Sequence, residues 1–326
     1  MNDADDADDF GLKADDLGLV WPYVDVHVHI QHAAHRAPAG EPCGQSFEKY
    51  LARMAQTNVM AAIPSPAPAA AGGPRERGIQ HVCGQNDAIA AGCRRDPERF
   101  PIGLALLDTG CSQAAADEIE RAMTRAGLAG LMCPPGAPGD AGHPPDTVLH
   151  AALEVVDKRC GLALLHVGGS GIAPPTAAGY ARRFRRTTFI MGNVSTNEAV
   201  HRESIAAFAG LENVWCDVAQ HPGHPATARG TGGAWDLADL VRGLSAGRLL
   251  FGSDAPFFDY RLLLQEIEAA RIDAPRKDRI AWANAVDLIR RFRPGWMPPS
   301  RPPALPAQFA GVDLWKQAPE KPGRLL

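Results

Sequence analysis

Two histidines, spaced two positions apart, stand at the end of an apolar run near the start of the chain. His27 and His29 close the segment VDVHVH at 24–29, whose pattern is typical of a β-strand. Side chains alternate along a strand, so both imidazoles point to the same side. With 11 His in the chain, chance alone gives about 0.4 such pairs. The position of the pair favours a function, because burying two polar side chains at the end of a core strand costs free energy. Metal binding would offset this cost.

Two further polar residues end apolar runs in the same way. His166 ends LALLH at 162–166, and Asp254 follows the run 249–251 in Gly252-Ser253-Asp254. Either residue alone is more typical of a core histidine bonded to the backbone or of a helix-capping aspartate. With His27 and His29 they make three imidazoles and one carboxylate, a set that suits one divalent ion, zinc first, with manganese, iron or cobalt also possible. One coordination position would hold water.

Short apolar runs alternate with longer amphipathic stretches between these residues. Eight strand–helix units of about 34 residues each predict a (β/α)8 TIM barrel over 21–293 rather than an open doubly wound sheet. No strand leads into a glycine-rich phosphate-binding motif. All strands of such a barrel end at one mouth, which would bring the four polar residues together. The predicted strands are 23–30, 59–63, 102–107, 128–132, 162–167, 188–191, 214–216 and 249–251. The predicted helices are 46–56, 85–95, 112–126, 147–158, 176–185, 197–208, 235–244, 261–270 and 277–291.

The same motifs resemble those of the amidohydrolase superfamily, specifically its amidohydrolase-related branch with aminocarboxymuconate-semialdehyde decarboxylase and related hydrolases, lactonases and hydratases. The resemblance runs over most of 22–292 and includes the closing segment Asn284-Ala285-x-x-Leu288. It implies that the three strand-end histidines and Asp254 bind one metal, and that Asp254 takes the proton from the attacking water. The chemistry agrees, because a carboxylate that touches both the cation and the water is a ready general base.

The chain departs from this family at the sixth strand. Relatives place there a histidine that polarises the substrate or moves a proton, whereas this chain has Asn193. A carboxamide can donate a hydrogen bond to a carbonyl or an oxyanion, but it cannot transfer a proton near neutral pH. Either Asn193 serves purely as such a donor, or another imidazole replaces the missing one, with His221 the first candidate and His224 the second. An asparagine at this position is also consistent with an altered reaction or with a loss of catalysis.

A cysteine ends the fourth strand, in Leu131-Met132-Cys133-Pro134. Binuclear relatives often place there a carbamylated lysine that bridges two metals, so Cys133 argues for a mononuclear site. The thiol could be a soft ligand or a nucleophile, although a buried apolar thiol is the commoner case. Cys133 and His224 are also candidates for substrate contacts.

These residues favour an enzyme with one divalent ion that acts on a small organic substrate. Metal-activated water with Asp254 as the base, and with Asn193 or His221 stabilising the oxyanion, predicts hydrolysis of an amide, ester or lactone. The alternative is metal-dependent nonoxidative decarboxylation of a small aromatic or enoic acid. A third possibility is a catalytically altered barrel that only binds metal or a small molecule.

The two ends of the chain differ from the barrel in composition. Of the 326 residues, 1–20 contain seven Asp and one Lys, which predicts an acidic flexible tail and leaves the body close to neutral although the formal net charge is -4. A nearly neutral body does not fit a nucleic-acid binder. Eight Pro from position 294 onward predict an extended arm over 294–326, which would pack onto the body or onto a second subunit of a homodimer. Trp296, Phe309, Leu314 and Trp315 are the residues expected to fix it.

Neither export nor membrane insertion is expected. The seven Cys form no C-x-x-C pair, the N-terminus is acidic, and no apolar run is long enough to cross a bilayer, so we expect a cytoplasmic protein with reduced thiols.

The prolines and glycines of 64–75 predict a long loop.

Overall fold

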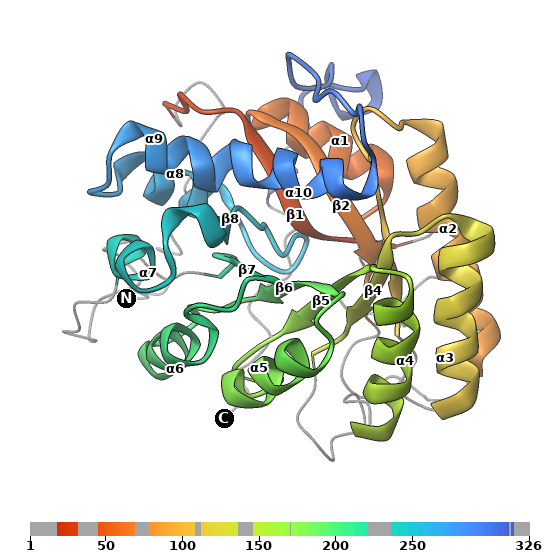
Figure 1. Cartoon of the computed structure of the whole chain (residues 1–326). Helices are drawn as coiled ribbons and strands as arrows, with labels where there is room; N and C mark the ends of the chain where they lie inside the picture. Colours follow the sequence, from red (N-terminus) through yellow and green to blue (C-terminus); the bar gives the residue numbers. More distant parts are fainter. Residues whose placement is uncertain are drawn as a thin grey trace, which may run out of the picture.

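In the part of the chain that the structure describes, eight parallel strands form the centre, with helices around them (Figure 1). The computed structural model describes residues 18–31, 45–68, 78–107, 112–135, 146–169, 171–220, 236–312 and 314–315. The strands are β1 (Tyr23–Ile30), β2 (Val59–Pro66), β3 (Leu104–Leu106), β4 (Gly130–Cys133), β5 (Leu162–His166), β6 (Thr188–Gly192), β7 (Val214–Asp217) and β8 (Leu249–Leu250). β1 pairs with β2, and β3 through β8 pair in sequence order.

Backbone hydrogen bonds join the last strand to the first. Val26 N donates to Phe251 O at 3.1 Å, and Asp254 N donates to His27 O at 2.8 Å. Side chains from all eight strands then meet in one buried cluster inside the ring. This cluster includes Val24, Ile63, Leu104, Met132, Leu164, Ile190, Trp215 and Leu250. The eight-stranded (β/α)8 barrel predicted from the sequence is confirmed.

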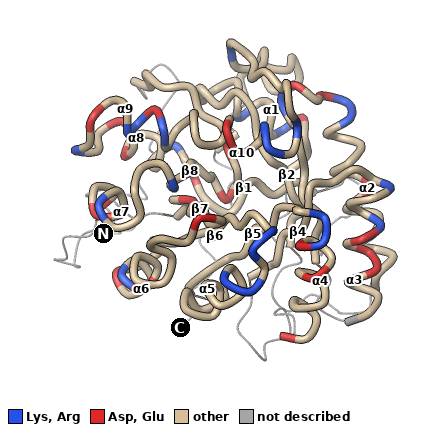
Figure 2. The backbone as a smooth tube through the Cα atoms, in the orientation of Figure 1, with Lys and Arg blue, Asp and Glu red and all other residues tan. Residues whose placement is uncertain are grey.

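The helices lie outside the ring because each buries only one face against the strands. They are α1 (Phe47–Gln56), α2 (Gly78–Arg95), α3 (Ser112–Arg121), α4 (Asp146–Lys158), α5 (Pro174–Arg183), α6 (Glu198–Phe208), α7 (Leu237–Leu244), α8 (Arg261–Ala269), α9 (Ala274–Asp278) and α10 (Asn284–Phe292). A second buried cluster fills the layer between strands and helices, and α10 packs Ala285, Leu288 and Ile289 against the interior cluster. Positively charged Lys and Arg and negatively charged Asp and Glu alternate over the outer helices, with neither sign gathered on one side in this view (Figure 2).

Local signals fix several of these helix starts. Ser46 accepts a hydrogen bond from Lys49 N at the start of α1, and Asn197 accepts one from Val200 N at the start of α6. Asp236 forms a reciprocal capping box at the start of α7. Such caps satisfy backbone N–H groups that have no partner within the helix.

Several predicted boundaries differ from the structure, and those of β2 and α2 are among them. The loop expected from residue 64 begins later, because β2 continues through Pro66 and pairs Pro64 and Pro66 with Val28 and Ile30. A proline lacks the N–H that a central strand must donate, but the side of β2 away from β1 shows no regular ladder, so little is lost there. The helix expected from residue 85 begins seven residues earlier, at Gly78.

The described part of the proline-rich arm packs onto its own chain. Trp296 is buried, and so is Leu314, whose carbonyl oxygen accepts a hydrogen bond from Arg53 Nη2 at 3.1 Å. The Trp315 ring lies 5.1 Å from the guanidinium of Arg53 and 4.5 Å from that of Arg261. At the other end, residues 1–17 of the predicted acidic tail lie outside the described residues. Among the described helices, none is long and apolar enough to span a membrane.

Candidate metal centre

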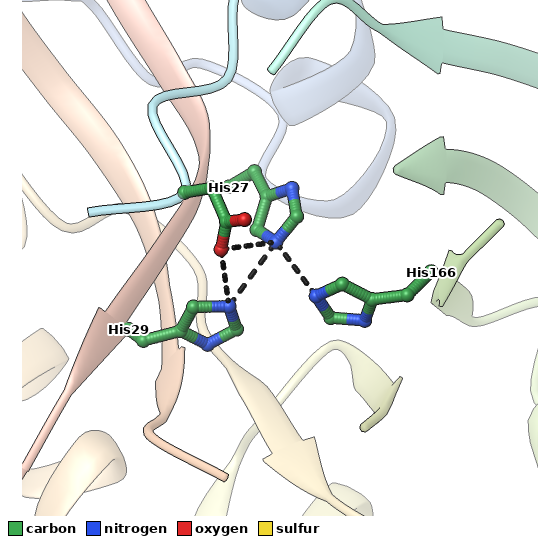
Figure 3. Close-up of side chains that lie close together, drawn as sticks. His27, His29 and His166 are labelled. Carbon is green, nitrogen blue, oxygen red and sulfur yellow. Dashed lines mark hydrogen bonds and ion pairs between the residues drawn. The ribbon is translucent and has the colours of Figure 1, made fainter. Parts of the chain in front are cut away.

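Three imidazoles and one carboxylate meet at the mouth of the barrel. His27 and His29 come from β1, His166 ends β5, and Asp254 follows β8. Figure 3 shows the three rings turned toward one another. His27 Nε2 lies 3.1 Å from His29 Nε2 and 2.9 Å from His166 Nε2, and Asp254 Oδ1 lies 3.1 Å from His29 Nε2. One ligand atom from each residue lies within 4.8 Å of all the others, and all four side chains are buried. This group could hold one metal ion.

The other ring nitrogen of each histidine meets a hydrogen-bond acceptor. His27 Nδ1 lies 2.8 Å from Asp217 Oδ2, and His166 Nδ1 lies 2.8 Å from Cys133 O. His29 Nδ1 lies 3.1 Å from Ser65 Oγ, which itself donates to a backbone carbonyl. These partners assign the proton to Nδ1 in all three neutral rings. Three Nε2 lone pairs therefore face one another, an arrangement that is stable only with a cation or a proton between them.

The electrostatics of the three histidines differ. Burial disfavours the charge on His27, but the carboxylates of Asp217 and Asp254 outweigh it and raise its pKa to about 9. Burial lowers the pKa of His29, and burial together with the neighbouring imidazoles lowers the pKa of His166 to about 3. Two rings therefore offer free lone pairs at neutral pH, while the third carries a proton that an ion must displace.

Asp254 is held as a carboxylate. Burial opposes its ionisation, but the charge on His27 and the contact with His29 hold its pKa well below the usual range. Its Oδ2 accepts hydrogen bonds from Asn193 Nδ2, at 3.4 Å, and from Gln220 Nε2. Asn193, Gln220 and Asp254 have φ angles of 64°, 58° and 51°. Left-handed backbone is unfavourable for residues other than glycine, and here it is concentrated where three loops meet around one carboxylate.

Of the other site residues predicted from the sequence, Asn193 and Cys133 lie close to the four clustered residues. Asn193 lies at the site, but one of its N–H groups donates to Asp254 rather than standing free for an oxyanion, and its buried Oδ1 has no hydrogen-bond partner among the described residues. Cys133 contributes its carbonyl oxygen to His166, and burial raises the pKa of its thiol to about 12. The thiol is not one of the four clustered ligands. His221 and His224 lie outside the described residues.

Three residues at the site are not indicated by the sequence analysis. Asp217 ends β7, just as His166 ends β5, and this position is the signal that could have identified it. Asp25 accepts hydrogen bonds from His27 N at 3.0 Å, Ser253 N at 2.9 Å and Tyr50 Oη at 2.5 Å, and so ties the first strand to the loop after the last. Gln220 stands in the loop after β7, where no sequence pattern indicates its direction.

Comparison with known families places most of the chain in one of them. A family model described as Amidohydrolase matches residues 24–291. No curated protein matches the chain.

Solved structures share the fold at low sequence identity. A 2,6-dihydroxybenzoate decarboxylase from Rhizobium aligns over 83% of this chain and 99% of its own, with a TM-score of 0.59 and 18% identity. A dihydroxybenzoic acid decarboxylase from Polaromonas sp. JS666, solved with manganese and 2-nitroresorcinol, aligns over 84% and 98%, with a TM-score of 0.60 and 17% identity. A 5-carboxyvanillate decarboxylase from Novosphingobium aromaticivorans, solved with manganese and 4-hydroxy-3-methoxy-5-nitrobenzoic acid, aligns over 84% and 97%, with a TM-score of 0.56 and 14% identity.

Proposed function

Because the chain belongs to the amidohydrolase family, we propose that it is a metal-dependent hydrolase of a small ester, lactone or amide. His27, His29, His166 and Asp254 would hold one divalent ion. The observation that carries the proposal is the convergence of three Nε2 atoms and one carboxylate oxygen, with every outer Nδ1 committed to an acceptor.

The donor set fits the ion. Neutral imidazoles with one carboxylate are borderline ligands that suit zinc, and they also accept manganese. We propose zinc as the resident ion. Manganese is the main competitor, because two of the similar decarboxylase structures contain it.

The residues then divide the chemistry among themselves. The bound ion supplies a positive charge that polarises a carbonyl and makes a nearby water more acidic. Asp254 accepts a proton from the attacking water at Oδ2, the oxygen that accepts hydrogen bonds from the carboxamides of Asn193 and Gln220. It later returns this proton to the leaving group. Asn193 holds Asp254 through one N–H, and its second N–H remains available to an oxyanion. No imidazole beyond the three ligands is required for this sequence of proton transfers.

The protonation state of Asp254 favours hydrolysis over decarboxylation. The charge on His27 and the carboxamides of Asn193 and Gln220 stabilise its ionised form, so the resting group is a base. Hydrolysis begins with removal of a proton from water, whereas decarboxylation must deliver a proton to carbon. Decarboxylation of a hydroxylated aromatic acid is the second candidate, because three solved structures with this fold are decarboxylases of such acids.

One screen separates the two reactions. Protein loaded with zinc or with manganese is incubated with lactones and esters and, separately, with dihydroxybenzoates and carboxyvanillate, and the products are identified by chromatography and by release of CO2. We expect ring-opened or cleaved acids from the first group. Turnover that is confined to aromatic acids and releases CO2 would replace hydrolysis with decarboxylation.

A variant pair tests the site itself. Asp254→Asn should abolish turnover, because a carboxamide cannot accept the proton. Asp87→Asn, which removes an exposed carboxylate on α2 paired with Arg121, is the matched control and should retain full activity. Retained activity in Asp254→Asn would refute the assigned base.

A further inference from the structure

Asp217, at the end of β7, shares its two oxygens between two parts of the site. It is fully buried. Oδ2 accepts from Nδ1 of His27, and Oδ1 accepts from the backbone N–H groups of Asn193, at 2.9 Å, and of Ala219, at 3.0 Å. Three donors from three segments of the barrel therefore converge on one carboxylate.

The two backbone contacts lead directly to the groups that hold Asp254. Asn193 is itself bound through its N–H, and Ala219 immediately precedes Gln220. Both carboxamides then donate to Oδ2 of Asp254. Because Asn193 and Gln220 have left-handed backbone, their direction depends on the contacts that fix these turns.

Two glycines show how closely the strands enclose the pair of His27 and Asp217. A Cβ on Gly252 would lie 2.8 Å from His27 Cβ and 3.0 Å from Asp217 Cγ. A Cβ on Gly192 would lie 3.1 Å from His27 Cε1 and 3.3 Å from Asp217 Oδ2. These two glycines, at the end of β6 and in the loop after β8, thus leave the space that this carboxylate–imidazole pair occupies.

We propose that Asp217 is a positioning residue that couples metal binding by His27 to the placement of the Asn193 and Gln220 carboxamides. The inference rests on the proposed metal site. Through Oδ2 it keeps a proton on Nδ1 of His27, so that Nε2 is the nitrogen that gives up its proton to the ion. Through Oδ1 it fixes the two turns that orient the groups around Asp254. One buried carboxylate thereby sets the geometry of both the ligand and the base.

The substitution Asp217→Asn separates this role from simple burial. A carboxamide has one accepting oxygen and one donating nitrogen, so it cannot accept from all three donors. If its oxygen stays with the backbone N–H groups, its nitrogen faces Nδ1 of His27 and forces the proton to Nε2, where the ion must bind. If it faces His27 with its oxygen, two buried backbone N–H groups lose their acceptor.

Glu118→Gln is a matched control, because Glu118 is also a buried carboxylate and lies on α3, outside the site. Its Oε1 accepts from Asn86 Nδ2 at 2.8 Å, and its Oε2 accepts from Arg121 Nε and from the thiol of Cys83. These partners belong to α2 and α3. Glu118→Gln therefore removes a buried charge without altering the contacts of His27, Asn193 or Gln220.

The experiment measures zinc affinity by competition with a chromophoric chelator at pH 9.5, with circular dichroism to confirm folding. This pH lies above the pKa of about 9 of His27, so that competition from the second proton on this ring is small in every variant. We expect Asp217→Asn to bind zinc about 10- to 100-fold more weakly than wild type, and Glu118→Gln to stay within about threefold. Equal affinity in Asp217→Asn and wild type would overturn the proposal. Absence of zinc binding in wild type would instead refute the proposed function.

A second measurement tests the coupling. At saturating zinc, Asp217→Asn should still show a lowered kcat, because the carboxamides around Asp254 are displaced; full recovery of kcat would leave Asp217 acting on His27 alone and overturn the coupling. If Asp217→Asn does not fold, nitrogen NMR of the histidine rings in zinc-loaded wild type decides. A proton on Nδ1 of His27 supports the proposal, and a proton on its Nε2 overturns it.

Discussion

Metal affinity at this site should change with pH through a single histidine. Without metal, the pKa of His27 is raised to about 9, because Asp217 and Asp254 outweigh the effect of burial. The pKa values of His29 and His166 are lowered, so these rings are neutral at pH 7. The extra proton on His27 Nε2 then points at the lone pairs of its two neighbours, which lie 3.1 and 2.9 Å away. It occupies the place that an ion would take.

The size of the pH effect on metal affinity follows from the exchange of this His27 proton for a metal ion. Because the pKa of His27 is raised to about 9, the ring holds its second proton below pH 9 and loses it above pH 9. Metal affinity therefore rises with pH and levels off near pH 9. At pH 7 about one His27 in a hundred is deprotonated, which makes the apparent affinity about 100-fold weaker than its upper limit, or about 2.7 kcal/mol. The affinity should therefore increase about tenfold per pH unit between pH 6 and 8.

Isothermal titration calorimetry tests this directly. Titrating zinc at pH 7 in buffers with different ionisation enthalpies gives the number of protons released, which should be about one per zinc. Chelator competition from pH 6 to 8 gives the slope. Release of no proton together with a flat profile would refute the charge assigned to His27.

Three other predictions concern packing and reactivity. Gly252→Ala places a methyl group against His27 and should cost about 1–3 kcal/mol in a urea titration and weaken zinc binding; unchanged values would show that the pair can shift freely. Cys133 should resist iodoacetamide at pH 8 in the folded protein, because a pKa of about 12 leaves roughly one thiolate in ten thousand; modification as fast as at the exposed Cys160, read by mass spectrometry, would contradict this. Trp315→Ala removes the ring beside Arg53 and should destabilise the fold by about 2 kcal/mol, seen as a lower Tm, whereas an alanine at the exposed Val312 should leave Tm unchanged.

The sequence predicts the four clustered residues because of a property of parallel barrels. His166 and Asp254 each follow an apolar run, and in this fold all such runs end at one mouth. The same rule applied to Cys133 identifies the right place but not the right atom, since the backbone carbonyl faces His166 while the thiol stays buried. Strand position alone does not separate these two outcomes.

Other features depend on contacts that no local pattern encodes. Gln220 reaches Asp254 only because its backbone takes a left-handed turn, and Asp25 meets Tyr50 only because α1 packs beside β1. The sequence misplaces the end of β2 because proline normally interrupts strands, yet Pro64 and Pro66 need no donor there. Such features arise from packing between segments rather than from the period of hydrophobic residues.

The seam between β1 and β8 has a consequence for assembly of the protein. His27 and Asp254 lie on opposite sides of this seam and are joined across it by the hydrogen bond from Asp254 N to His27 O. A nascent or partly folded chain, in which the last strand has not reached the first, lacks a complete ligand set. An ion held by all four residues would therefore bind only the closed barrel and stabilise it against the open forms. At a free concentration one hundred times its Kd it would add about 2.7 kcal/mol of stability, and its removal by a chelator would take that stabilisation away.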